Sequence, residues 1–205
     1  KDRGILREAP LHAVSVRRRL IPRPYAIRKP REYIARAPGD IVQVDTLDVR
    51  PLPGVVIKQI TARDVVSRWD VIAAYTSAGA GAAASFLDAL IGRTPFAVRA
   101  IQVDGGAEFQ SLFETACQRR GIRLFVLPPR SPKLNGHVER AQRTHTEEFY
   151  EVTDCSFELA DLRRDLRRWE EVYNTVRPHQ SLGYLTPKEY LQCYHHIPGK
   201  EVMCH

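Results

Sequence analysis

The order of the apolar runs beyond residue 40 constrains the fold of this chain more than any other feature. Three of these runs are short, rich in Val and Ile, and separated only by turn residues at 51–54 and near Asp64. Runs of this kind predict β-strands, and their close succession predicts an antiparallel meander. The three runs span residues 41–49, 55–62 and 68–75.

Helices and strands alternate after this meander. A helix, a strand, a helix and a strand are predicted in turn at residues 80–92, 98–103, 108–120 and 122–127. Two more helices are predicted at residues 136–151 and 156–174. The sequence therefore predicts an α/β fold, with a five-stranded mixed sheet flanked by helices and a helical C-terminal extension.

Basic charge is concentrated at the start of the chain. The formal net charge of the 205 residues is +7, yet residues 1–39 hold eleven Lys or Arg against three acids, so the remainder is near neutral. Prolines are dense in the same stretch and favour extended backbone. We divide the chain into a basic Pro-rich arm or linker at 1–39, a core at 40–191 and a tail at 192–205. Such an arm is suited to tracking nucleic-acid phosphates, although a merely solvated tail is the alternative.

The cysteines and the hydropathy indicate the compartment. The chain has four cysteines without CxxC pairing and no secretory leader, which favours a reduced, cytoplasmic environment. The uncharged stretch 71–87 is rich in small residues and is followed by Asp88, so we expect no membrane span. The chain begins with Lys1 instead of Met, from which we expect further residues upstream in the natural protein.

Three acids stand where a mixed sheet presents side chains. Asp45 lies in the first predicted strand, Asp104 ends the fourth, and Glu139 lies in the helix after the fifth. Phosphodiester transfer needs a strong nucleophile and relief of negative charge, which two Mg²⁺ ions can supply. Mg²⁺ prefers hard oxygen ligands, so a few carboxylates suffice. Each acid also has a structural alternative: a surface strand residue, a turn residue and a first-turn helix residue, respectively.

Four segments carry a family resemblance. They are VQVDT at 42–46, VDGGAEF at 103–109, SPKLNGHVERAQRT at 131–144 and YNTVRPHQSLGYLTPKEYL at 173–191. Together they resemble the DDE transposases of bacterial insertion sequences and the retroviral integrase core, over residues 40–191. The resemblance implies a ribonuclease H-like fold in which Asp45, Asp104 and Glu139 are the catalytic, metal-binding acids. The 34 residues between the last two compare with 35 commonly found in the family, and Gly105 replaces a frequent Asn.

Several polar residues near Glu139 are candidates for contacting DNA, because they lie on its helix or in the preceding loop. For each of them alone, a solvated surface residue is the alternative. The candidates are Arg130, Lys133, Asn135, His137, Arg140, Gln142 and Arg143.

Two other patterns suggest zinc but fit poorly. The H-x-E of His137 and Glu139 opens a deaminase signature, yet no P-C-x-x-C follows. A terminal cluster matches no standard zinc spacing, so we interpret it as incidental. Its members are Cys193, His195, His196, Cys204 and His205.

The resemblance implies a transposase or integrase that uses Mg²⁺, with Mn²⁺ as a substitute, to cut DNA at the ends of a mobile element and join the 3′-OH to target DNA. We expect DNA as partner, a homo-oligomer when assembled on DNA, and a DNA-associated location in a bacterial cytoplasm. A ribonuclease H-like nuclease without strand transfer and an inactive, domesticated DNA-binding or assembly protein remain alternatives. The element and its end sequences do not follow from the sequence.

Overall fold

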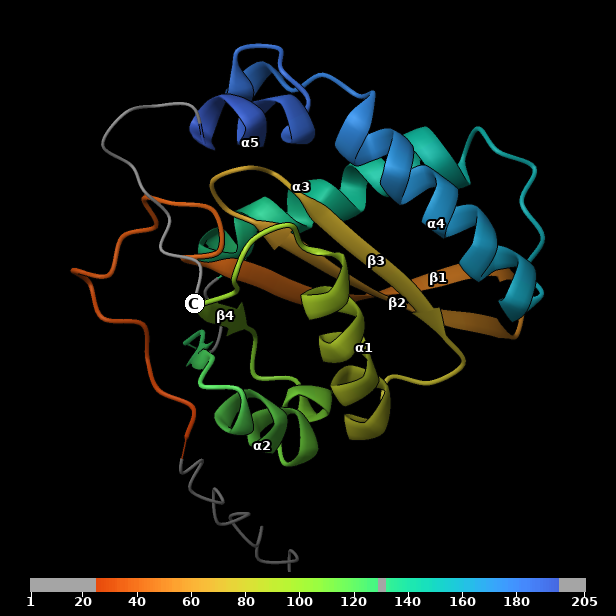
Figure 1. Cartoon of the computed structure of the whole chain (residues 1–205). Coiled ribbons are helices and arrows are strands. Elements are labelled where there is room, and N and C mark those ends of the chain that lie inside the picture. Colours follow the sequence, from red (N-terminus) through yellow and green to blue (C-terminus); the bar gives the residue numbers. More distant parts are fainter. Residues whose placement is uncertain (1–24, 129–131, 196–205) are drawn as a thin grey trace, which may run out of the picture.

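The computed structural model describes residues 25–128 and 132–195. Its centre is a five-stranded mixed sheet in the order β3-β2-β1-β4-β5 (Figure 1). The first three strands pair antiparallel, whereas β4 pairs parallel with both β1 and β5. The predicted meander and the mixed five-stranded sheet are therefore confirmed. The strands are β1 Val42–Leu52, β2 Val55–Asp64, β3 Asp70–Tyr75, β4 Ala100–Val103 and β5 Arg123–Val126.

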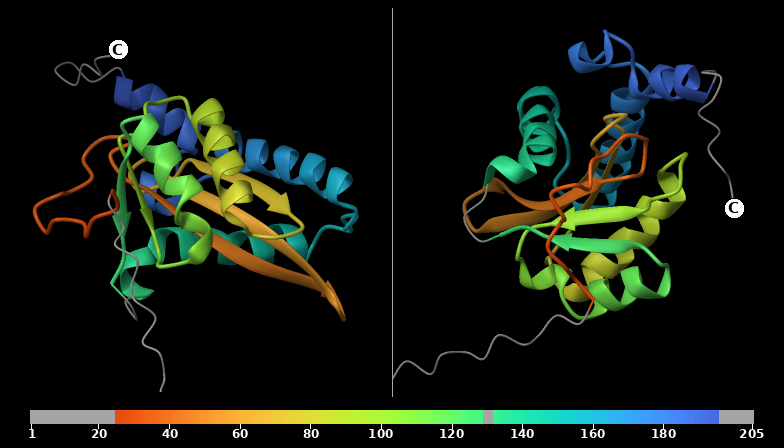
Figure 2. Two further views of the ribbon diagram at one scale, coloured as in Figure 1. Left: turned by 90° about the horizontal axis from the view of Figure 1, so that it is seen from below. Right: turned by 90° about the vertical axis from the view of Figure 1, so that its left-hand side faces the viewer.

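Helices cover both faces of the sheet. One face packs against α1 and α2, and the opposite face packs against α3 and α4, as the two views in Figure 2 show. The α-helices are α1 Ala80–Arg93, α2 Leu112–Arg119, α3 Gly136–His145, α4 Leu159–Thr175 and α5 Pro187–His195. Short helical turns connect them: η1 Ala107–Phe109, η2 Pro132–Asn135, the π-turn η3 Thr146–Tyr150 and η4 Gln180–Leu182.

The two faces of the sheet differ in polarity. Alternate residues of a strand point to opposite faces, so Val42 and Val44 join the apolar core with α1 and α2 while Gln43 and Asp45 point toward α3. Across the neighbouring strands, the residues paired with Gln43 form a row of buried polar side chains beneath α3. Farther along the same face, Ile72 of the sheet packs in a second apolar cluster with Leu166 of α4. The row contains Gln102, Gln43, Arg63 and Asp70. A polar layer therefore separates α3 from the sheet near the acids.

Two helix boundaries differ from those that the sequence predicts. The helix expected at 108–120 is interrupted, because Ser111 adopts a left-handed φ of 51° between η1 and α2. The helix expected at 136–151 is α-helical only to His145 and ends in the π-turn. The C-terminal extension is helical as expected, and α5 begins with a capping box. In this box Glu189 N donates to Thr186 Oγ1 and Thr186 N donates to the Glu189 carboxylate.

The described part of the basic arm lies along the edge of the sheet. Ile27 N donates to Leu124 O at 3.0 Å and Val126 N donates to Ile27 O at 2.9 Å, so the arm extends the sheet beyond β5. The backbone amides of Tyr25 and Ala26 both donate to the Glu114 carboxylate. These contacts cover an edge strand that would otherwise present unpaired backbone groups. The division of the chain at residue 39 stays a prediction.

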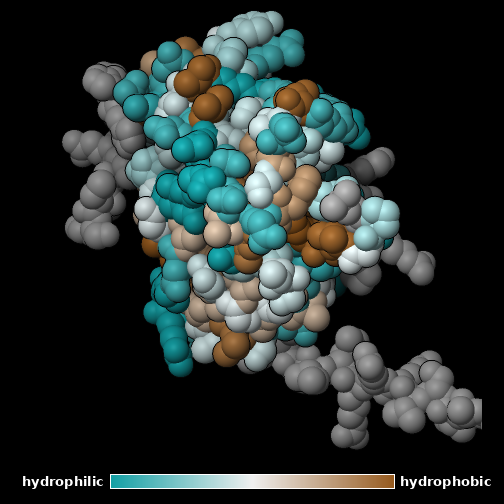
Figure 3. Space-filling model, turned by 90° about the vertical axis from the view of Figure 1, so that its right-hand side faces the viewer, coloured by the Kyte–Doolittle hydropathy of each residue, from teal (hydrophilic) through white to brown (hydrophobic). Residues whose placement is uncertain are grey.

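The outer surface carries only scattered apolar side chains on the face shown in Figure 3. Among the exposed large apolar residues are Val152 and Phe157, which lie apart from the sheet core. Single exposed apolar residues are normal for a folded domain. In the described part of the chain no helix is long and apolar enough to cross a membrane.

Candidate active site

Strand pairing places Asp45 and Asp104 side by side. Val44 pairs with Val103 in the parallel β1–β4 ladder, and each aspartate is the next residue along its strand direction. Asp45 is half-buried and accepts a hydrogen bond from Thr46 N, whereas Asp104 is exposed and accepts one from Gly106 N. The two aspartates therefore lie next to each other on inner strands of the sheet, where β4 ends beside the first half of β1.

Two glutamines fix the helix that carries Glu139. Gln43 Oε1 accepts hydrogen bonds from His137 N at 3.0 Å and Val138 N at 3.1 Å, which satisfies free amides at the start of α3. Gln43 Nε2 and Gln102 Nε2 both donate to Leu134 O at 2.8 Å. Because each glutamine precedes an aspartate by two residues, one pair of strands positions two acids and the helix of the third.

Sequence reasoning missed these positioning glutamines. A signal was present, since the tripeptide Gln-Val-Asp occurs at 43–45 and again at 102–104. With side chains alternating along a strand, such a repeat predicts that Gln and Asp share a face in both strands. Pairing of the strands then predicts two neighbouring glutamines behind two neighbouring aspartates.

The three acids influence one another electrostatically. Burial, together with the negative charges of Asp104 and Glu139, raises the pKa of Asp45 to about 6, while the hydrogen bond from the Thr46 amide acts in the opposite direction. Gln142 on α3 lies near enough to lower this pKa, although its Nε2 satisfies no hydrogen-bond geometry. The acids are thus neighbours. However, within residues 25–128 and 132–195 no three His, Cys, Asp or Glu side chains are close enough together to hold a metal ion.

The chemistry of this group nonetheless suits a divalent cation. In the part of the chain that the structure describes, none of the three acids forms an ion pair, so their mutual repulsion is not compensated. Carboxylate oxygens are the ligands that Mg²⁺ prefers. A cation drawn between the acids would remove the repulsion that raises the pKa of Asp45.

The candidate DNA-contacting residues are distributed over different surfaces. Gln142 is buried beside Asp45, and Arg143 is exposed next to it on α3. Asn135 is buried at the start of α3, while His137 and Arg140 line a cleft on the other side of the helix. Two further candidates cannot be placed in this way: Arg130 lies outside the described residues, and only the backbone of Lys133 is described, in η2. Of the predicted terminal cluster, His196, Cys204 and His205 also lie outside the described residues.

A buried polar network anchors α4 beneath the site. Arg63 donates two hydrogen bonds to Asp70, at 2.7 and 2.6 Å, and a third to the Tyr173 hydroxyl. Burial alone would raise the pKa of Asp70, but the Arg63 charge and its hydrogen bonds hold it below its ordinary value. His145, 3.2 Å from Asp70, has a lowered pKa because of burial, and its Nδ1 accepts a hydrogen bond from Trp169.

The 173–191 motif supplies much of this anchoring. Asn174 accepts a hydrogen bond from Asp70 N and donates one to Asp70 O, so it binds the outer edge of β3. Arg177 pairs with Glu148 on the π-turn, and His179 N donates to Leu185 O. The motif therefore has a structural role that the sequence alone does not reveal.

Comparison with known sequences supports the resemblance. Residues 120–187, a stretch that includes Glu139, match the family Integrase core domain. Over 98 residues the chain is 31% identical to the insertion element IS476 uncharacterized 39.2 kDa protein of Xanthomonas euvesicatoria. That alignment covers 47% of this chain and 28% of the relative, so the chain spans little more than a quarter of the relative's length.

Solved structures with the same fold are retroviral integrase cores. The catalytic core domain of BIV integrase superposes with a TM-score of 0.59 at 24% identity, covering 76% of this chain and 95% of that one. The HTLV-2 integrase catalytic core domain in complex with magnesium gives 0.60 at 14% identity, covering 75% and 96%. A chain of the simian T-cell lymphotropic virus intasome in complex with PP2A regulatory subunit B56 gamma gives 0.66 at 20% identity, covering 86% and 62%.

The protein therefore has the ribonuclease H-like fold of an integrase catalytic core. Its resemblance to the DDE transposases and retroviral integrase cores is confirmed by the family match, the insertion-element relative and the shared fold.

Proposed function

We propose that this chain is the catalytic core of a DNA transposase or integrase, with Asp45, Asp104 and Glu139 as the ligands of two Mg²⁺ ions. The observation that carries the proposal is the paired Gln-Val-Asp strands, which place two aspartates together and position the helix of the glutamate. The effect of the Asp104 and Glu139 charges on the pKa of Asp45 supports a shared site.

The proposed reaction has two steps at phosphorus. Water attacks the phosphodiester at an element end, and the bond to the 3′ oxygen breaks to leave a free 3′-OH. That hydroxyl then attacks a phosphodiester of target DNA, whose own 3′ oxygen leaves as a new hydroxyl. When bound, the Mg²⁺ pair would activate the attacking oxygen and neutralise charge on the leaving one.

The chain's own residues have defined tasks in this scheme. The three carboxylates would bind the Mg²⁺ ions and hold them in position. Asp104 and Glu139 are exposed, which leaves room for a DNA strand beside the half-buried Asp45. Arg143, exposed next to this face of α3, would hold a phosphate of the cleaved strand. Assembly on paired DNA ends is assigned to a homo-oligomer located on bacterial DNA.

A strand-transfer assay tests the proposal. The substrate is a pre-cut duplex made from the DNA that borders the coding sequence of this chain, with a plasmid as target and Mg²⁺ or Mn²⁺ present. We expect joined products with the wild-type chain and none with Asp104→Asn or Glu139→Gln, while Asp154→Asn serves as a control. Hydrolysis without joining would instead support a ribonuclease H-like nuclease, and activity that survives both substitutions would refute the assigned site.

A further inference from the structure

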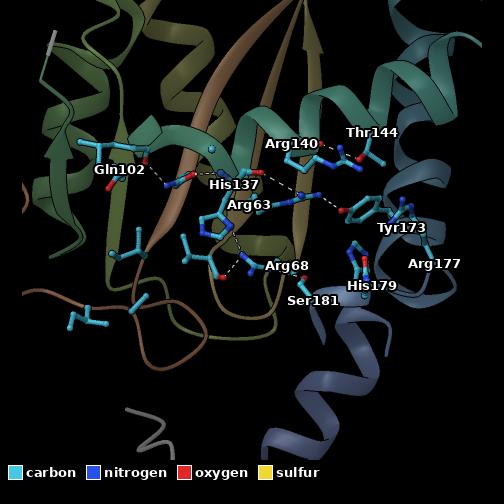
Figure 4. A pocket seen from close by; sticks show the side chains of 18 of the residues that line it. Arg63, Arg68, Gln102, His137, Arg140, Thr144, Tyr173, Arg177, His179 and Ser181 are labelled. Atoms are coloured by element: carbon cyan, nitrogen blue, oxygen red, sulfur yellow. Dashed lines mark hydrogen bonds between the residues drawn. The ribbon is translucent and has the colours of Figure 1, made fainter. Parts of the chain in front are cut away.

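A basic cleft lies on the side of α3 away from the three acids. Its volume is about 1000 Å³, and Figure 4 shows it between the arm, the start of α3 and the segment around η4. His137, Arg140 and Thr144 line it from one face of α3, at the spacing of adjacent helical turns. None of the three acids lines this cleft. Gln43 and Gln102, which position α3, do line it, so the cleft adjoins the proposed active site without including its acids.

The described lining of the cleft is strongly cationic. It contains no Asp or Glu but five basic residues, namely Lys29, Arg63, Arg68, Arg140 and Arg177. Arg63 and Arg177 are paired with Asp70 and Glu148, respectively. Within the described residues, by contrast, Arg68 and Arg140 form no ion pair. Arg140 thus brings an unpaired guanidinium group to the cleft, and the charge of Arg68 is offset only by the Asp64 carboxylate, which lies beyond ion-pair distance.

Arg68 is held in place toward the cleft. It stands in the turn between β2 and β3 with a left-handed φ of 62°. Its Nη1 donates to Val65 O at 2.6 Å and contacts His137 Nδ1, and its Nε donates to Ser181 Oγ at 3.3 Å. A charged side chain that is partly removed from water and fixed before binding is a feature of built anion sites.

His179 provides a second, independent observation at the cleft. It is only 7% exposed and lines the cleft, and among the residues that the structure describes its Nε2 has no hydrogen-bond partner (Figure 4). Burial and the charges of Arg177 and Arg63 lower its pKa to about 4, so the ring is neutral at physiological pH. A buried polar atom left without a partner is costly, and in the Nε2–H tautomer of the neutral ring this nitrogen would donate to a phosphate oxygen that reaches it from the cleft.

We propose that this cleft binds phosphate groups of a DNA strand, as a contact separate from the strand at the acids. Guanidinium groups match phosphate oxygens in geometry and charge. The cleft is much larger than a single phosphate, and Lys29 continues the positive lining along the arm, which favours a polynucleotide over a free anion. The inference deepens the proposed function and rests on the chain acting on DNA.

DNA binding in the absence of divalent metal tests this inference. A fluorescein-labelled duplex of random sequence and the matching single strand are titrated with the chain in EDTA, and anisotropy gives the affinity. Arg68→Gln and Arg140→Gln should each weaken binding roughly fivefold to tenfold. Each should also reduce the slope of log affinity against log salt by roughly one. Arg119→Gln on α2 removes the same charge from an exposed site outside the cleft and should change neither value.

A second measurement reports the cleft directly. Inorganic phosphate should shift the ¹⁵N resonance of His179 Nε2, and the oligonucleotide should shift the same resonance at much lower concentration. Equal affinity of Arg140→Gln and Arg119→Gln for DNA would overturn the inference, because Arg140 is exposed and its loss leaves the fold intact. A His179 response to phosphate but not to DNA would also overturn it, since the cleft would then be a site for a small anion.

These outcomes are distinct from those of the strand-transfer assay. Failure of the acids to support joining would leave metal-free DNA binding unaffected, because none of the three acids lines the cleft. Conversely, strand transfer by the wild-type chain together with unchanged DNA affinity of Arg68→Gln and Arg140→Gln would support the proposed function and refute only the DNA-binding role of the cleft.

Discussion

Asp45 is the least exposed of the three acids, and in the metal-free protein its burial makes ionisation of its carboxyl group unfavourable. Its pKa of about 6 in the fold compares with an ordinary value of 3.8, so the folded chain binds this proton more tightly than the unfolded chain does. Stability from this group is therefore gained as pH falls through about 6 toward 4 and is lost at neutral pH. Two pKa units correspond to at most about 3 kcal/mol.

Asp45→Asn should accordingly raise the melting temperature of the metal-free chain near neutral pH and flatten its pH dependence between about 6 and 4. The same substitution should abolish the stabilisation that Mg²⁺ gives to the wild-type chain. Asp48→Asn is the matched control, because Asp48 lies on the same strand and has a pKa lowered by its hydrogen bond to Lys58. A destabilised, still Mg²⁺-responsive Asp45→Asn chain would contradict this account.

At the scale of elements, α3 is positioned by side chains of two strands. Gln43→Ala removes three hydrogen bonds and leaves helix amides without partners. We expect a loss of about 1–3 kcal/mol in the free energy of unfolding. Misplacement of Glu139 should lower the rate of strand transfer about a hundredfold. Gln118→Ala, on the exposed side of α2, is the control, and an equal effect of both substitutions would argue against a positioning role.

Helix α4 closes the outer edge of β3 through Asn174. Asn174→Ala leaves the buried N–H and C=O of Asp70 without partners, and we expect a loss of about 2–3 kcal/mol in the free energy of unfolding. Thr175→Ala, the next residue on the helix, removes only an exposed hydrogen bond to Glu171 O and should be nearly neutral. Denaturant unfolding of the two variants compares them directly, and similar midpoints would contradict the edge role.

Periodicity predicted the strands and most helices because Val and Ile runs and apolar spacing dominate their burial. It failed at Ser111, where a left-handed residue interrupts an apparently continuous helix. It also failed for the polar residues that bridge elements, since a pattern of hydropathy assigns Gln43, Gln102 and Asn174 to the surface although all three are buried. Such contacts depend on strand register, which a single sequence specifies only indirectly.

At the scale of the whole molecule, the resemblance predicts that Asp45, Asp104 and Glu139 belong together. Strand pairing places the two aspartates next to each other, and the charge of Glu139 on α3 influences the pKa of Asp45. Gln142 and Arg143 follow Glu139 by three and four residues, a spacing that predicts a shared face of the helix. The basic cleft was not foreseen, because it combines the arm, a turn of the meander and the 173–191 motif, which are far apart in sequence. Sites assembled from distant segments require the three-dimensional fold.

The central claim is that the three acids share a metal site, and a crystal structure of the chain soaked in Mn²⁺ tests it most directly. Anomalous density should appear between Asp45 and Asp104, with Glu139 turned toward it, and should be absent from the Asp45→Asn protein. Anomalous density only at other residues, with no metal ion between these three carboxylates, would contradict the account.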